Sequence, residues 1–99
     1  MLDFYIIQDD KPIPDFPEQA DLVFAGGLDY LTFENLKKKG IIEDSYNYYS
    51  DFRWEKTIIE QKIKKINQDR LESDIDIKNL LTLLDKAHVN DSGLIAYCD

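Results

Sequence analysis

The chain has 99 residues, of which 43% are hydrophobic and 12% aromatic, so residues 1–99 are long enough for a single domain with one modest core. Its 20 acidic and 12 basic residues give a formal net charge of −8, which disfavours direct binding of nucleic acid or of an anionic membrane surface. The single cysteine, Cys98, excludes a disulfide framework within one chain, and without a signal peptide or a membrane-length apolar stretch we expect a cytoplasmic protein.

Two short strands are predicted in the first 30 residues. Residues 3–8 (DFYIIQ) are rich in aromatic and β-branched side chains, and residues 21–27 (DLVFAGG) form a second apolar run that ends in two glycines. Between them, residues 9–20 hold all three prolines of the chain, and proline lacks the donor that a central strand needs. We expect this segment to be an acidic, semi-rigid loop.

A first helix is predicted over residues 28–40. Asp29 or Thr32 can serve as its N-cap, depending on where the first turn begins. Three consecutive lysines stand in the last turn, where the helix dipole favours positive charge, and Gly40 suits the position just after a helix.

Two further helices are predicted in the second half. Residues 55–68 are amphipathic, and Trp54 extends their apolar face by one turn. Residues 73–89 form the other helix, with Ser73 or Asp74 as its cap. The apolar face of the first consists of Ile58, Ile59, Lys62, Ile63 and Ile66, and that of the second of Ile77, Leu80, Leu81, Leu84, Ala87 and His88.

The order of the elements predicts the fold class. Residues 90–93 are turn material, and residues 94–98 form a last strand that has to pair with the earlier ones. Strands at both ends with helices between them are typical of an α+β domain. We expect a small antiparallel sheet of about three strands, with about three helices packed on one face.

Five of the chain's twelve aromatic residues fall in the stretch YNYYSDFRW, residues 46–54. If this stretch is extended, one side of it is nearly all aromatic, and we interpret Phe52 and Trp54 as core residues. For the tyrosines two interpretations stay open, because tyrosine also offers rigid, amphipathic contact area to a partner. At least one of Tyr46, Tyr48 and Tyr49 is therefore a candidate for partner binding.

We find no catalytic or metal-binding signature. The only histidine, His88, lies on or beside an apolar stripe, and the local sequence suggests no oxyanion donor or orienting group for a pair with Cys98. Asp74 and Asp76 resemble the start of a calcium loop, but Asn79 stands where that loop requires glycine, so a helix cap is the better interpretation. We expect no catalytic residue, no metal site and no cofactor.

The acidic residues concentrate toward the N-terminus. Residues 1–50 carry ten acidic and four basic residues, whereas residues 51–99 carry ten and eight. Such a distribution serves solubility, or it complements a basic partner protein. The candidate partner-binding residues are Asp9, Asp10, Asp15, Glu18, Glu43, Asp44, Tyr46, Tyr48, Tyr49 and Asp51.

Residues 46–99 combine YSDFRW (Tyr49, Asp51, Phe52), a helix, the Leu-rich helix LLTLLDKA and the closing strand GLIAYCD. This pattern resembles small bacterial immunity proteins, which neutralise a cognate toxin of interbacterial competition systems. The resemblance implies a single-domain, cytoplasmic protein without enzymatic activity. Where the toxin is a basic nuclease, an acidic inhibitor gains association rate from the complementary fields. The alternatives are a structural protein that forms a homodimer and an enzyme that uses His88 and Cys98.

Overall fold

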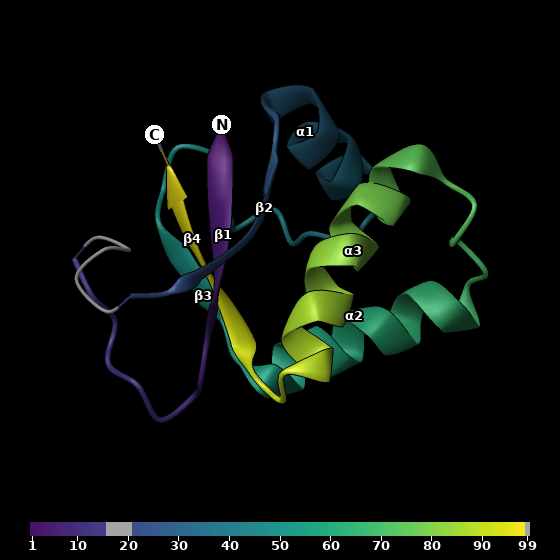
Figure 1. The fold of residues 1–99 in the computed structure, drawn as a ribbon. Coiled ribbons are helices and arrows are strands. Elements are labelled where there is room, and N and C mark those ends of the chain that lie inside the picture. The colour runs from purple at the N-terminus through teal and green to yellow at the C-terminus, as the bar shows by residue number, and fades with distance from the viewer. Residues whose placement is uncertain (16–20, 99) are drawn as a thin grey trace.

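The computed structural model describes residues 1–15 and 21–98, and this part of the chain forms four strands and three helices (Figure 1). In chain order the elements are β1 (Leu2–Ile7), β2 (Val23–Leu28), α1 (Tyr30–Lys38), β3 (Phe52–Trp54), α2 (Lys56–Gln68), α3 (Ile75–Val89) and β4 (Gly93–Cys98). The strands form one antiparallel sheet in the order β2-β1-β4-β3. The α+β class and the antiparallel sheet are confirmed, and the sheet has one strand more than expected.

The additional strand is β3, at one edge of the sheet. The sequence predicts an extended or mixed segment at this place but no strand that pairs. Phe52 lies opposite Ala96 and Trp54 opposite Leu94, so only three residues of the segment join β4. A strand this short has too little alternation to be recognised from its own sequence.

The helices lie on one side of the sheet (Figure 1), and the side chains of each strand alternate between that side and the other. Phe4 and Trp54 are fully buried on the helix side, with ring centroids 5.5 Å apart. Both belong to the main core, whose helix members include Phe33, Leu36, Ile59, Ile66, Ile77, Leu80, Leu83, Leu84 and Ala87. A second, smaller cluster on the opposite side consists of Ile7, Ile95 and Tyr97, with Tyr5 and Leu22 packed against them.

The loop after β1 is fastened over that opposite side by side chains from the sheet. The Tyr97 hydroxyl donates a buried hydrogen bond of 2.7 Å to the Pro14 carbonyl. The Arg53 guanidinium donates to the carbonyls of Gln8 and Lys11, at 2.6 and 2.7 Å. The second apolar cluster is therefore closed by loop backbone rather than by another layer of helices.

The buried stripe of α3 differs from the predicted one. Ile77, Leu80, Leu84 and Ala87 are buried as expected, but His88 is exposed and Leu83 is buried in its place. Leu83 packs on β2 at Gly26, where an added Cβ would lie 2.7 Å from the Leu83 Cδ2 atom. The contact with β2 thus turns α3 toward Leu83 and leaves His88 at the surface.

Lys62 is a buried cation on the apolar face of α2. Its Nζ donates to the Ile41 carbonyl and to the Glu43 carboxylate, both at 2.9 Å, and lies 4.9 Å from the ring centroid of Trp54. Partial burial acts to raise the pKa of Glu43, but the hydrogen bonds, chiefly from Lys62, outweigh it and hold that pKa below its usual value. Lys62 therefore ties the segment after α1 to α2 without leaving a buried charge unpaired.

We expect Lys62→Ala to lower the free energy of unfolding by about 1–3 kcal/mol, because it removes the buried ammonium and leaves the Ile41 carbonyl without its donor. Urea unfolding followed by Trp54 fluorescence measures the change. Lys64→Ala is the matched control on the exposed side of the same helix, with an expected effect within about 0.5 kcal/mol. Equal effects of the two variants would show that Lys62 has no structural role.

Candidate functional site

Three tyrosine rings, those of Tyr30, Tyr48 and Tyr49, meet in a group that we call the tyrosine triad. The ring centroids are 5.4 Å apart for Tyr30 and Tyr48, 5.1 Å for Tyr48 and Tyr49, and 6.0 Å for Tyr30 and Tyr49. Tyr48 lies close to Leu2 and Cys98, which pair at the ends of β1 and β4. The triad therefore lies at the end of the sheet that carries both termini (Figure 1).

The three rings differ sharply in exposure. Tyr48 is buried and also contacts Phe33 in the main core, with centroids 5.7 Å apart. Tyr30 and Tyr49 are 50% and 70% exposed. Burial raises the pKa of the Tyr48 hydroxyl, so it stays neutral at physiological pH. Tyr48 is thus the fixed floor of the triad, and the other two rings present their surfaces to solvent.

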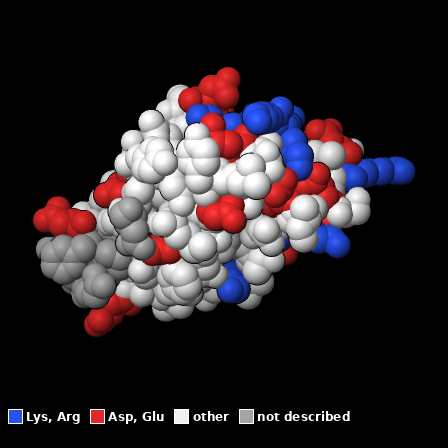
Figure 2. All heavy atoms as spheres, turned by 90° about the horizontal axis from the view of Figure 1, so that it is seen from above, with Lys and Arg blue, Asp and Glu red and all other residues white. Residues whose placement is uncertain are grey.

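Asp29 borders the triad and Asp51 lies at the same end of the sheet, and hydrogen bonds hold each carboxylate in place. Asp29 accepts from the Thr32 backbone N–H at 2.8 Å as the N-cap of α1, and this bond holds the Asp29 pKa below its usual value. Asp51 accepts from the Cys98 backbone N–H at 3.0 Å. Figure 2 looks down on this end of the molecule, and most of its lysine and arginine side chains lie in the right half of the view.

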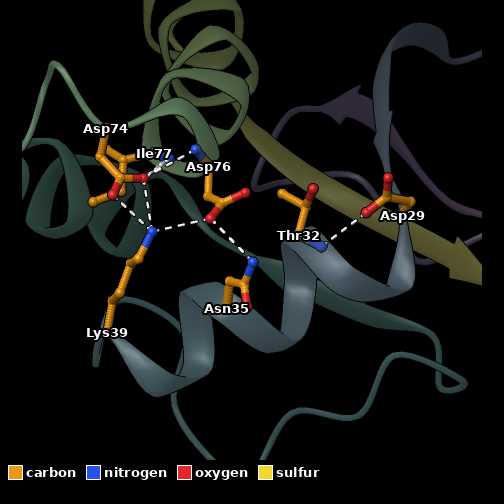
Figure 3. Close-up of polar contacts among 7 residues, drawn as sticks. All are labelled: Asp29, Thr32, Asn35, Lys39, Asp74, Asp76 and Ile77. Atoms are coloured by element: carbon orange, nitrogen blue, oxygen red, sulfur yellow. Dashed lines mark hydrogen bonds and ion pairs between the residues drawn. The ribbon is translucent and has the colours of Figure 1, made fainter.

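A polar network fixes the far end of α1 and thereby the position of Tyr30 (Figure 3). Lys39 Nζ lies 2.7 Å from an Asp74 oxygen and 2.9 Å from an Asp76 oxygen, and Asn35 donates to Asp76 at 3.2 Å. Asp74 also accepts from the backbone N–H groups of Asp76 and Ile77 as the N-cap of α3. The carboxylates that resemble a calcium loop in the sequence are therefore a helix cap and an ion-pair bridge between α1 and α3.

Several of the acidic residues that the sequence marks as contacts have structural partners. Asp9 accepts from the Lys56 backbone N–H at 3.0 Å, which caps α2 from a distant part of the chain, and Glu43 pairs with Lys62. Lys56 follows Trp54, which lies opposite Leu94 at the start of β4. Asp9 is therefore at the opposite end of the sheet from the triad.

The remaining candidate residues have different surroundings. Asp10 and Asp44 are exposed, whereas Tyr46 is half-buried against Phe52, with ring centroids 4.9 Å apart. Asp15 is exposed and, like Asp51, lies near the Tyr97 hydroxyl, whose pKa is raised by burial and then by these two charges. Glu18 lies outside the described residues. Among the described candidates, Tyr48, Tyr49 and Asp51 thus lie at the end of the sheet that carries both termini, whereas Asp9 lies at the other end.

The sequence did not identify Tyr30, Asp29 and Leu31 as site residues. Leu31 is exposed, although it is an apolar residue in the first turn of α1. One signal was available, since Leu31 lies about 200° around the helix from the core residue Phe33. Nothing in the local sequence shows that Tyr30 meets Tyr49, because that contact depends on the tertiary fold.

His88 and Cys98 are not brought together. His88 lines a shallow groove of about 370 Å³ between α2 and α3, near the start of β4, whereas Cys98 is the last residue of that strand. Cys98 lies five residue steps along the strand from Gly93, which is about 17 Å. The alternative of an enzyme that uses this pair therefore has no support in the fold.

Other kinds of site have little basis in the described part of the chain. Among residues 1–15 and 21–98 no group of three or more His, Cys, Asp or Glu side chains is arranged to hold a metal ion. Within the same residues no helix combines the length and the apolarity needed to cross a bilayer. A hollow of about 520 Å³ lies beside the loop after β1. Its lining includes Asp21, which borders residues that the structure does not describe, so we assign no ligand to it.

No known family, no curated protein and no solved structure matches this chain. Its function is therefore argued from the geometry and charge of its own surface.

The pH dependence of stability tests the network at the end of α1. Hydrogen bonds from Lys39 and from the α3 backbone hold the Asp74 pKa in the folded protein below its pKa in the unfolded chain. The stabilisation that ionised Asp74 gives the fold is therefore complete above the unfolded-state pKa and is lost as the pH falls through the folded-state pKa. We expect Asp74→Asn to have a lower urea midpoint than the parent at pH 7. The difference should shrink as the pH falls below about 4.

The matched control is Asp44→Asn, an exposed carboxylate outside this network. It should keep the parent's urea midpoint at pH 7 and the parent's decline in acid. A constant gap between Asp74→Asn and the parent from pH 7 to pH 3 would contradict the role of the Lys39–Asp74 pair.

Proposed function

We propose that the chain is a non-enzymatic, acidic binding protein that neutralises a basic partner protein, and that this partner is a cognate bacterial toxin, as the resemblance to immunity proteins implies. The observation that carries the proposal is the exposed pair Tyr30 and Tyr49, with the Asp29 carboxylate beside them. Tyrosine rings that present apolar area and a polar hydroxyl are the side chains most enriched at binding hot spots, together with tryptophan and arginine.

Preorganisation supports this assignment. The Tyr49 backbone N–H donates to the Asn47 side chain at 2.9 Å, and Ser50 N–H donates to the Asn47 carbonyl at 3.1 Å, so Tyr49 sits on a closed turn. Tyr30 stands in the first turn of a capped helix. Because both rings are held before binding, little conformational entropy has to be lost when a partner docks.

Charge supports a basic partner. The formal net charge of −8 produces a field that attracts positive proteins over distances longer than direct contacts, and complementary fields raise association rates. The Asp29 carboxylate adds local negative charge beside the exposed tyrosines, and Asp51 adds more at the same end of the sheet. Hydrophobic contact on the rings and steering by the surrounding charge then act at the same place.

Capture from the source cell tests the proposal. We expect the tagged chain to retain one stoichiometric basic protein at low salt and to bind it more weakly as the salt concentration rises. Expression of that protein should arrest growth, and co-expression of the chain should relieve the arrest. Tyr49→Ala should weaken the complex by about tenfold or more. Phe24→Ala, which removes another exposed aromatic ring, is the matched control and should bind like the parent. Recovery of no basic partner, or of one that is harmless when expressed alone, would count against the function.

A homodimeric structural protein is the second candidate, because β2 is an edge strand with exposed apolar side chains. Val23 and Phe24 are 64% and 56% exposed, and exposed edge strands are common sites of strand pairing between chains. Two features of this edge oppose pairing. The register with β1 shifts around Ala25, and Lys86 Nζ donates to the Ala25 carbonyl at 2.8 Å.

We expect the purified protein to be a monomer, because the Lys86 contact and the bulge interrupt the β2 edge. Size-exclusion chromatography with light scattering across a range of concentrations gives the mass. A stable dimer that Phe24→Asp dissociates would instead support the homodimer through β2.

A further inference from the structure

We infer that the tyrosine triad with Asp29 is a receptor for an arginine side chain of the partner, whose guanidinium stacks on the exposed rings of Tyr30 and Tyr49. This inference rests on the proposed function and names the chemical group that the site takes.

The ring geometry places two exposed aromatic side chains close together. The Tyr30 and Tyr49 rings are inclined by only 31°, whereas Tyr48 is nearly perpendicular to both, at 87° and 89°. Tyr48 is buried, so it fixes the separation of the other two from below. Tyr30 and Tyr49, which are 50% and 70% exposed, therefore offer ring surface close together, and this surface attracts a cation through the negative potential of the ring faces.

The charge around the rings selects a cation rather than an anion. The free N–H groups at the start of α1 would favour an anion near Tyr30, but the Asp29 carboxylate accepts from the Thr32 N–H there and supplies a full negative charge. Asp51, bound to the Cys98 N–H, adds a second carboxylate at the same end. A positively charged group on the triad is thus stabilised by the rings and by the neighbouring Asp29 carboxylate, while Asp51 adds negative charge at the same end of the sheet.

Arginine fits this arrangement better than lysine. A guanidinium is planar, stacks on an aromatic ring and still directs its N–H donors sideways toward a carboxylate, whereas an ammonium is compact and more strongly hydrated. Leu31, exposed next to Tyr30 in the same helical turn, offers apolar surface to the methylene stem of an arginine. The stacking surface, the adjacent carboxylate and the apolar margin match the three parts of the arginine side chain.

The site is testable without the partner, by titrating the full chain with short peptides and observing its amide signals by NMR. The probes are acetyl-Gly-Arg-Gly-amide, the same peptide with lysine, and the same peptide with citrulline, which keeps the planar shape but has no charge. We expect the arginine peptide to shift the signals of Tyr30, Leu31 and Tyr49 most, the lysine peptide to shift them less, and the citrulline peptide to leave them nearly unchanged.

Variants separate the ring from its hydroxyl. Tyr49→Ala should lower the affinity for the arginine peptide by about two- to fivefold, the range expected for loss of one exposed cation–π contact. Tyr49→Phe keeps the aromatic face and should bind like the parent. Phe24→Ala is the matched control, because Phe24 packs on Tyr5 of the second apolar cluster, away from the triad. Unchanged signal dispersion in each variant confirms that it is folded.

The other outcomes overturn either the arginine site or the proposed function, and they distinguish the two. Equal shifts with the arginine and lysine peptides would contradict an arginine site, because they would show that the chain attracts any positive charge. Signals that move with protein concentration alone would identify a second copy of the chain as the occupant. If cells yield a basic toxin whose affinity is unaffected by Tyr49→Ala, the arginine site fails and the proposed function stands. If the peptide binds as expected but cells yield no basic partner, the proposed function fails and the arginine site stands.

Discussion

The pairing of β1 with β4 is the contact on which the rest of the structure depends. It joins the first strand of the chain to the last along its whole length, from Leu2 opposite Cys98 to Ile7 opposite Gly93. Neither β2 nor β3 has another strand to pair with among the described residues, since each lies outside this central pair. Because the paired residues are 86 to 96 positions apart, closing this pairing costs chain entropy, and the core that Phe4 and Trp54 build on it has to offset that cost.

The same pairing creates the tyrosine triad. It places Leu2 and Cys98 side by side, and Tyr48 packs where they end. Asp51 then holds the Cys98 backbone, so the turn that carries Tyr49 is fixed to the end of β4. Tyr30 arrives from the other direction, on a helix that Lys39 anchors to α3. The exposed rings thus stand on elements that are themselves held by long-range contacts, which is why they can be positioned before any partner binds.

Sequence patterns were sufficient wherever local chemistry determines the structure. The Asp29 and Asp74 caps, Gly40 at φ 75° after α1, and the two long helices all follow from short-range rules. Patterns were insufficient where a distant contact decides the outcome. His88 is exposed rather than buried, because the packing of Leu83 on Gly26 of β2 sets which face of α3 points inward. Residues 52–54 form a strand because they pair with β4. Within the site, the sequence indicates at least one exposed tyrosine among Tyr46, Tyr48 and Tyr49 but not which one, and the contact of Tyr49 with Tyr30 depends on the tertiary fold.

The acidic residues have two roles that cannot be separated by counting them. Asp9, Asp29 and Asp51 accept backbone hydrogen bonds, and Glu43 neutralises a buried lysine, so these carboxylates stabilise the fold. A carboxylate that accepts from an N–H keeps its full charge, however, and still contributes to the field that a partner meets at a distance. Substituting these residues would weaken folding and attraction together. The exposed Tyr49 ring offers contact area, and its side chain holds no buried charge or backbone group in place. Substituting Tyr49 therefore tests recognition apart from stability.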